Sequence, residues 1–333
     1  MKDIYARTNN ICLVFLTMVT GTMALIYMKP MLIPLIFAIF IYSVLTPLVN
    51  LIRNKTNIPK AFAVFASLIL TALAFTLIVA IVVSSVEDFV QGAPKYSESL
   101  NDSIAYVQTQ LERFNIEINL EKVRAQLTSP VLSMAPKLTS QLLSFFGNLF
   151  LVFIFTIFMM TGESRSQSKS PLLKEVLLKV SSYVSSKFFL SLATGVLVWL
   201  VLVGFGVELA FIFALLTVLL NFIPTIGSII AIVLPLPVAF LQFQFGWQFI
   251  VILTLTSIIQ FGIGNVLEPK VMGDSMDLHP ITVLICLIFW GMVWGLAGMF
   301  LAVPITAILK IIFSRIEATE TLAEIMAGRL PDR

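Results

Sequence analysis

Residues 61–86 read AFAVFASLILTALAFTLIVAIVVSSV, a run without a charged side chain. About 20 apolar residues suffice for a helix to cross the hydrocarbon core of a bilayer, which is about 30 Å thick. The whole chain has this character, because 59% of its 333 residues are hydrophobic and 12% are charged. An ordinary soluble domain has about 45–50% apolar and about 25% charged residues. The sequence therefore predicts an all-α polytopic membrane protein.

Six full transmembrane helices are predicted from long apolar runs. They cover residues 11–28, 31–52, 61–86, 141–161, 188–206 and 246–267. Two further apolar regions, 208–241 and 281–313, are interrupted by glycine and proline, which free backbone polar groups at membrane depth. We therefore expect two helical hairpins or broken helices, or about eight spans by conventional counting. Neither half of region 208–241 is expected to span a bilayer by itself.

Charge placement divides the chain into six expected segments. They are transmembrane helices 1–3 at 1–86, a small external helical segment at 87–137, transmembrane helix 4 at 138–161, a cytoplasmic amphipathic linker at 162–187, a transport core at 188–313 and a cytoplasmic tail at 314–333. Lysine and arginine in the short loops 53–60 and 162–187 predict that these loops and both termini are cytoplasmic. The linker is expected to lie flat in the interface, and the tail to be a solvated helix.

Composition and motifs exclude several classes of function. The net charge of +3 is too small to indicate a nucleic-acid-binding protein. The sequence has no HExxH, GxSxG or GxxxxGK[ST] string, so we expect no enzyme activity and no cofactor. Asp274, Asp277 and His279 form a polar loop, but His279 is the single histidine, so we expect no metal site.

Ionisable residues are rare in the expected transport core. Glu208 and Glu268 are the acids between Phe188 and Pro269, and Glu208 lies at an expected external turn. Glu268 either pairs with Lys270 or with the following loop at a helix that Pro269 ends, or couples a proton or cation at the cytoplasmic mouth of a pathway.

Neutral polar residues and helix breakers complete the candidate site. Asn221 and Asn265 either bind a hydroxylated ligand or satisfy freed backbone groups. The proposed pathway residues are Asn221, Pro224, Gly227, Asn265, Glu268 and Pro269, and the hinge residues are Gly291, Gly295, Gly298 and Pro304. The glycines of the second set either allow close helix packing or make a pliable hairpin tip.

Three motifs in order resemble those of the autoinducer-2 exporter family of bacterial permeases. They are Asn221-x-Ile223-Pro224-x-x-Gly227, Asn265-x-x-Glu268-Pro269-x-x-Met272-Gly273, and Gly291-x-x-Trp294-Gly295-x-x-Gly298 followed by Ala302-Val303-Pro304. The resemblance covers nearly the whole chain. It implies a multi-pass permease of the bacterial inner membrane that forms homo-oligomers. It identifies motif positions in this sequence but implies no set of ligand-binding residues.

The leading hypothesis is a secondary transporter that exports a small polar molecule, with autoinducer-2-like compounds implied by the resemblance. The opposed hairpins are typical of secondary transporters with discontinuous helices. A Na⁺(Li⁺)/H⁺ antiporter is the first alternative, based on Glu268. A membrane scaffold without transport is the second, based on the external segment and the basic linker.

Overall fold

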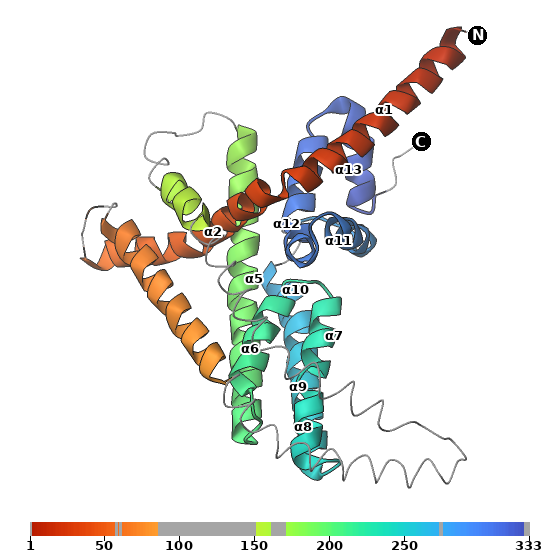
Figure 1. Cartoon of the computed structure of the whole chain (residues 1–333). Helices are drawn as coiled ribbons and strands as arrows, with labels where there is room; N and C mark the ends of the chain where they lie inside the picture. The colour runs from red at the N-terminus through yellow and green to blue at the C-terminus, as the bar shows by residue number, and fades with distance from the viewer. Residues whose placement is uncertain are drawn as a thin grey trace, which may run out of the picture. The chain divides into compact units, whose positions relative to one another are not determined.

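The computed structural model describes residues 2–56, 59, 62–85, 151–160, 171–272 and 276–329, and every regular element in these ranges is helical (Figure 1). This confirms the predicted all-α class. The expected external segment at 87–137 lies outside the described residues.

The helices follow one another with few long connections in the described ranges. They are α1 (Lys2–Tyr27), α2 (Lys29–Thr56), Phe62–Ser85, Leu151–Met160, α5 (Pro171–Gly204), α6 (Ala210–Leu220), α7 (Ile226–Val233), α8 (Leu236–Phe243), α9 (Trp247–Phe261), a π-helix (Gly262–Leu267), α10 (Glu268–Met272), α11 (Pro280–Trp294), α12 (Leu296–Phe313), a 3₁₀ turn (Glu317–Thr319) and α13 (Glu320–Met326).

Six helical segments in the described ranges are long and apolar enough to cross a membrane. They are Lys29–Thr46, Phe62–Ser85, Leu178–Gly204, Ile226–Phe243, Trp247–Met272 and Leu296–Phe313. The polytopic prediction is thus confirmed. The run at 11–28 contains a shorter apolar helix, Leu16–Tyr27. The expectation that neither half of 208–241 could span was wrong, because α7 and α8 continue through a short turn, where the Leu234 amide donates to the Ile230 carbonyl at 2.9 Å.

Helix α5 joins two segments that were expected to be separate. The linker helix after Pro171 and the span expected at 188–206 form one uninterrupted helix, Pro171–Gly204. No proline follows Pro171 in this stretch, so nothing removes a backbone donor from the helix. Residues 171–187 therefore continue into the span as one helix and do not form a flat linker before it.

The chain divides into two compact units. Unit 1 comprises Met1–Thr46, Leu149–Val184 and Met276–Arg333, and unit 2 comprises Pro47–Asn148 and Ser185–Ser275. The two broken regions of the expected core at 188–313 therefore belong to different units, 208–241 to unit 2 and 281–313 to unit 1.

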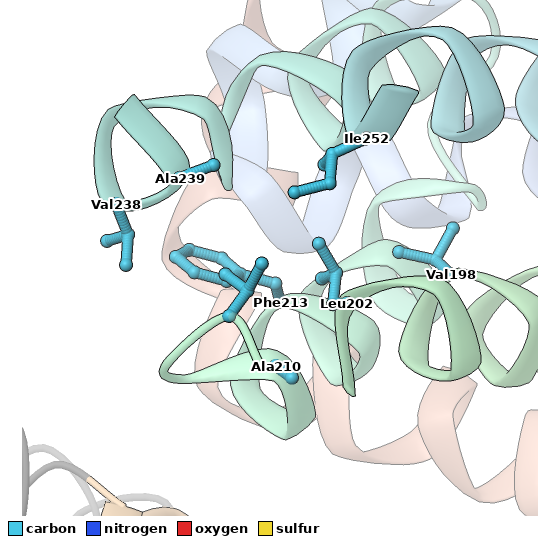
Figure 2. Packing of buried hydrophobic residues seen from close by; sticks show 8 residues of the cluster. Val198, Leu202, Ala210, Phe213, Val238, Ala239 and Ile252 are labelled. Carbon is cyan, nitrogen blue, oxygen red and sulfur yellow. The ribbon is translucent and has the colours of Figure 1, made fainter. Parts of the chain in front are cut away.

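Unit 2 contains a buried apolar cluster where α5, α6, α8 and α9 meet (Figure 2). Leu202 of α5 and Ile252 of α9 are each 0% exposed, and Figure 2 shows them beside Phe213 of α6. Val198, Val207, Ala210, Val238 and Ala239 complete the cluster. We refer to these eight residues as the apolar cluster.

Both expected helix breaks are present, and at each break a glycine allows the chain to make a tight turn. After α6, the chain turns at residues 221–225, and a Cβ on Gly227 would lie 1.8 Å from the Leu220 carbonyl oxygen. In unit 1, α11 ends at Gly295, whose φ of 65° suits glycine. A Cβ on Gly298 would lie 1.9 Å from the Trp290 carbonyl oxygen. Gly291 lies inside α11, and Gly298 and Pro304 lie inside α12, so the break itself is at Gly295.

The C-terminal segment of unit 1 is docked, which corrects the expectation of a solvated tail. The His279 amide donates to the Met326 carbonyl at 2.9 Å, and Ala323 is 0% exposed. Asp277 accepts from both Lys310 of α12 and Arg329 beyond α13. Burial raises the pKa of Asp277, but the hydrogen bonds and charges of Lys310 and Arg329 outweigh it and hold the pKa below its ordinary value.

We predict that Gly227→Ala and Gly298→Ala each destabilise the protein by about 1–3 kcal/mol or more, because the new Cβ would overlap a backbone carbonyl. Gly262→Ala is the matched control, since a Cβ there would meet no described atom within 4 Å outside the backbone of its own helix. Unfolding of the purified protein in detergent measures the effect. Equal midpoints for all three variants would show that the turns are not tight.

We also predict that α13 loosens at acid pH. Because folding lowers the Asp277 pKa, its stabilisation is complete above the pKa of an ordinary aspartate, about 3.9, and is lost as pH falls below that value. Hydrogen exchange of residues 320–326, corrected for intrinsic rates, should show lower protection at pH 3 than at pH 6. Asp277→Asn should give low protection at both pH values; protection equal to wild type at pH 6 would rule out this role.

Candidate functional site

A small polar cavity lies inside unit 2. It is lined by Leu190, Ser191 and Thr194 of α5, Asn221 after α6, Ser228 of α7, Gln260 of α9, Ile263 and Gly264 of the π-helix, and Glu268 of α10. Its volume is about 10 Å³, close to the minimum that holds one water molecule. The cavity is therefore closed to larger solutes in this conformation.

Three buried polar atoms at this cavity have no hydrogen-bond partner among the described residues. They are Ser191 Oγ, Asn221 Oδ1 and Gln260 Nε2. Each residue is at most 8% exposed. A fourth such atom in the described residues is Thr306 Oγ1 of unit 1. A buried polar group left unsatisfied costs about 1–3 kcal/mol, so these three atoms favour a water molecule or a solute hydroxyl group in the cavity.

The buried face of α5 explains how its side chains reach the cavity. Lys187, Ser191 and Thr194 are spaced i, i+4 and i+7, which places them on one face of a helix. Val198 and Leu202 continue that face into the apolar cluster. All five are at most 4% exposed. Along α5, the buried face thus changes from charged to polar to apolar.

Along helices α6 and α9, the buried face changes in the reverse order, from apolar to polar residues, as the residue numbers increase. In α6, Phe213 of the apolar cluster is followed by buried Thr217 and then by Asn221. In α9, Ile252 of the cluster is followed by buried Thr256 and then by Gln260. The three helices together place the polar cavity next to the apolar cluster.

An ion pair lies at the other end of the cavity. Lys187 of α5 donates to a carboxylate oxygen of Glu268. The side chains are 5% and 29% exposed respectively. About 15 residues separate Lys187 from Leu202, which corresponds to about 22 Å along the helix. The cavity therefore lies between a charged pair and an apolar cluster.

The pairing of Glu268 differs from the expected pairing with Lys270. Residues two apart on a helix do not face each other, so Lys270 projects away from Glu268. The prediction that Pro269 ends the helix was also wrong, since α10 continues to Met272. In the preceding π-helix, the Glu268 amide bonds five residues back to the Ile263 carbonyl. Pro269 follows directly in α10 and removes one backbone donor there without ending the helix.

The structure brings together two of the residues that were expected to form a pathway. Asn221 and Glu268 line the same cavity, whereas Asn265 is exposed on the π-helix and is not among the lining residues. Pro224 and Gly227 shape the turn that carries Asn221. The hinge residues Gly291, Gly295, Gly298 and Pro304 lie in unit 1.

Sequence reasoning missed Lys187, Ser191, Thr194, Ser228 and Gln260. A signal existed for the first three, because a lysine, a serine and a threonine at i, i+4 and i+7 form a polar stripe in an apolar helix. The described residues contain no group of three or more His, Cys, Asp or Glu side chains that could hold a metal ion. The chemistry that this site offers is therefore hydrogen bonding beside an ion pair.

Comparison with known proteins identifies the family. The sequence model described as AI-2E family transporter matches residues 13–318. The chain belongs to the AI-2E transporter family. Among members of similar sequence, AI-2 transport protein TqsA of Escherichia coli (strain K12) is 27% identical over 308 residues, 89% of each chain.

Two further relatives of this AI-2E family transporter are named for transport. YhhT of Escherichia coli (strain K12) is 30% identical over 310 residues, covering 89% of this chain and 88% of its own. YrrI of Bacillus subtilis (strain 168) is 25% identical over 306 residues, covering 85% and 86%. The site described above thus belongs to a multi-pass membrane transporter.

We predict that Lys187→Met destabilises this AI-2E family transporter by about 3–5 kcal/mol, because it leaves the Glu268 carboxylate unpaired in a largely buried site. Adding Glu268→Gln should restore most of the loss. Chemical unfolding in detergent measures both variants.

Lys179→Met is the matched control on the same helix. Lys179 is 45% exposed and pairs with Glu175 at 3.2 Å, and exposed pairs contribute about 0–1 kcal/mol. A Lys187→Met variant as stable as the Lys179→Met variant would show that the buried pair does not stabilise the fold.

Proposed function

We propose that this AI-2E family member is a secondary permease that exports a small polar solute through the cavity of unit 2. The observation that carries the proposal is the cluster of Ser191, Asn221 and Gln260, three buried polar side chains with unpaired atoms inside a helical unit of a transporter. Binding sites of secondary transporters are commonly built where helices are discontinuous. Asn221 follows the end of α6 and begins the turn to α7.

Autoinducer-2-like compounds are the proposed substrate class. The name of TqsA gives AI-2 as what that relative transports. A hydroxylated furanone is small, neutral and rich in hydrogen-bonding groups, which matches amide and hydroxyl side chains better than it matches a charged site. Because the cavity has a volume of about 10 Å³, transport of such a compound requires an expanded conformation.

The membrane setting is part of the proposal. We propose a location in the bacterial inner membrane with both termini in the cytoplasm, because lysine and arginine gather in residues 53–60 and ahead of the Leu178–Gly204 span. A homo-oligomer is proposed on the family resemblance.

A Na⁺(Li⁺)/H⁺ antiporter remains the second candidate, because Glu268 lines the cavity and a carboxylate can exchange a proton for a cation. Lys187 already neutralises this carboxylate, and a cation would have to displace it. This favours the permease over the antiporter.

We predict that purified protein in liposomes gives saturable flux of autoinducer-2, while empty liposomes give none. A bioluminescence reporter measures the exported compound, and a pH-sensitive dye measures proton release after a sodium or lithium jump. Asn265→Ala is the control variant, because Asn265 is exposed and does not line the cavity.

The two readouts separate the candidates. Autoinducer-2 flux without cation-dependent proton release supports the permease. Proton release that is lost in Glu268→Gln supports the antiporter instead. Absence of both activities would favour a scaffold without transport.

A further inference from the structure

We propose that Ser191, Asn221 and Gln260 form a three-point recognition site for an uncharged solute that carries hydroxyl groups. The proposal rests on the transport function above and specifies its substrate class by chemistry. It starts from the three unpaired atoms, Ser191 Oγ, Asn221 Oδ1 and Gln260 Nε2, which are contributed by α5, the end of α6 and α9 around one cavity.

The three atoms differ in hydrogen-bonding character. Asn221 Oδ1 accepts, Gln260 Nε2 donates, and the Ser191 hydroxyl does both. A hydroxyl group is itself a donor and an acceptor, so it can satisfy any of the three. A carboxylate has no proton for Asn221 Oδ1, and an ammonium has no lone pair for the Gln260 amide. The set therefore matches a neutral polyol, sugar or hydroxyfuranone.

Charge around the cavity favours the same class. Glu268 is the one ionisable residue among those lining the cavity, and it is bound to Lys187. The cavity therefore presents no uncompensated charge to a solute. An ion would leave water without a counter-charge, which is strongly unfavourable in a buried site.

The turn between α6 and α7 is the element that can enlarge the cavity. Thr225 has a φ of 60°, a conformation that is unfavourable for a β-branched residue. Asn221 and Ser228 flank this turn, and both line the cavity. Relaxation of the turn would therefore move two lining residues at once, and the recognition site would expand around the solute.

The test uses three probes of matched size in proteoliposomes: ribitol, which is neutral, ribonate, which is an anion, and 1-amino-1-deoxyribitol, which is a cation. Efflux of each labelled probe is measured for the wild type, Ser191→Ala, Asn221→Leu and Gln260→Met. Asn265→Leu is the matched amide control on the adjacent π-helix. Binding of the same probes to detergent-solubilised protein is measured in parallel by thermal shift.

The wild type should transport ribitol at least ten-fold faster than either charged probe. Asn221→Leu and Gln260→Met should each lower ribitol efflux at least ten-fold and abolish its thermal shift, and Ser191→Ala should lower efflux about three-fold. Asn265→Leu should remain within two-fold of the wild type. Both amide variants should unfold at or above the wild-type midpoint, because they replace an unpaired polar group with an apolar one.

Two results would overturn the proposal. One is ribitol efflux and binding that are unchanged in Asn221→Leu and Gln260→Met. The other is equal transport of the neutral and charged probes. If the wild type binds ribitol through these residues but transports no probe, the recognition site stands and the transport function fails. If it neither binds nor transports any probe, both fail.

Discussion

The whole structure depends on one constraint: a helix that stops inside a bilayer must still satisfy its backbone hydrogen bonds, because no water is present to do so. The chain meets this requirement at its two breaks by very short turns. Between α6 and α7, the Ile223 amide donates to the Leu220 carbonyl at 2.8 Å and the Gly227 amide to the Ile223 carbonyl at 3.1 Å. At the break in unit 1, the Gly295 amide donates to the Gly291 carbonyl at 2.8 Å.

The side chains at the cavity do not follow this rule. Backbone amides at the α6–α7 turn, such as those of Ile223 and Gly227, are paired, while Ser191 Oγ, Asn221 Oδ1 and Gln260 Nε2 have no partner among the described residues. Such groups lower the stability of a fold, and protein sites that act on ligands commonly accept this loss. Stability and solute recognition therefore place opposite demands on the same three positions.

The sequence was sufficient to predict the helical membrane class and the two breaks, because run length, glycine and proline act locally. It also placed Asn221 and Glu268 in the candidate site. It did not reveal the partner of Glu268, because Lys187 is 81 residues away in the chain and lay in a segment expected to be a surface linker. Asn265, which was expected in the same pathway, is exposed and does not line the cavity. Its side-chain direction depends on the π-helix, which spacing alone did not indicate.

The π-helix between α9 and α10 affects more than its own six residues. An α-helix turns by about 100° per residue, so Glu268 would lie about 80° around the axis from Gln260 if the helix were regular. A π-helix takes up one extra residue, and this brings the two side chains to within about 20° of each other. Gly262–Leu267 therefore acts as a rotational spacer that aligns the carboxylate with the cavity-lining amide, and a helix that reverted to regular geometry would separate the two groups without any change in their identity.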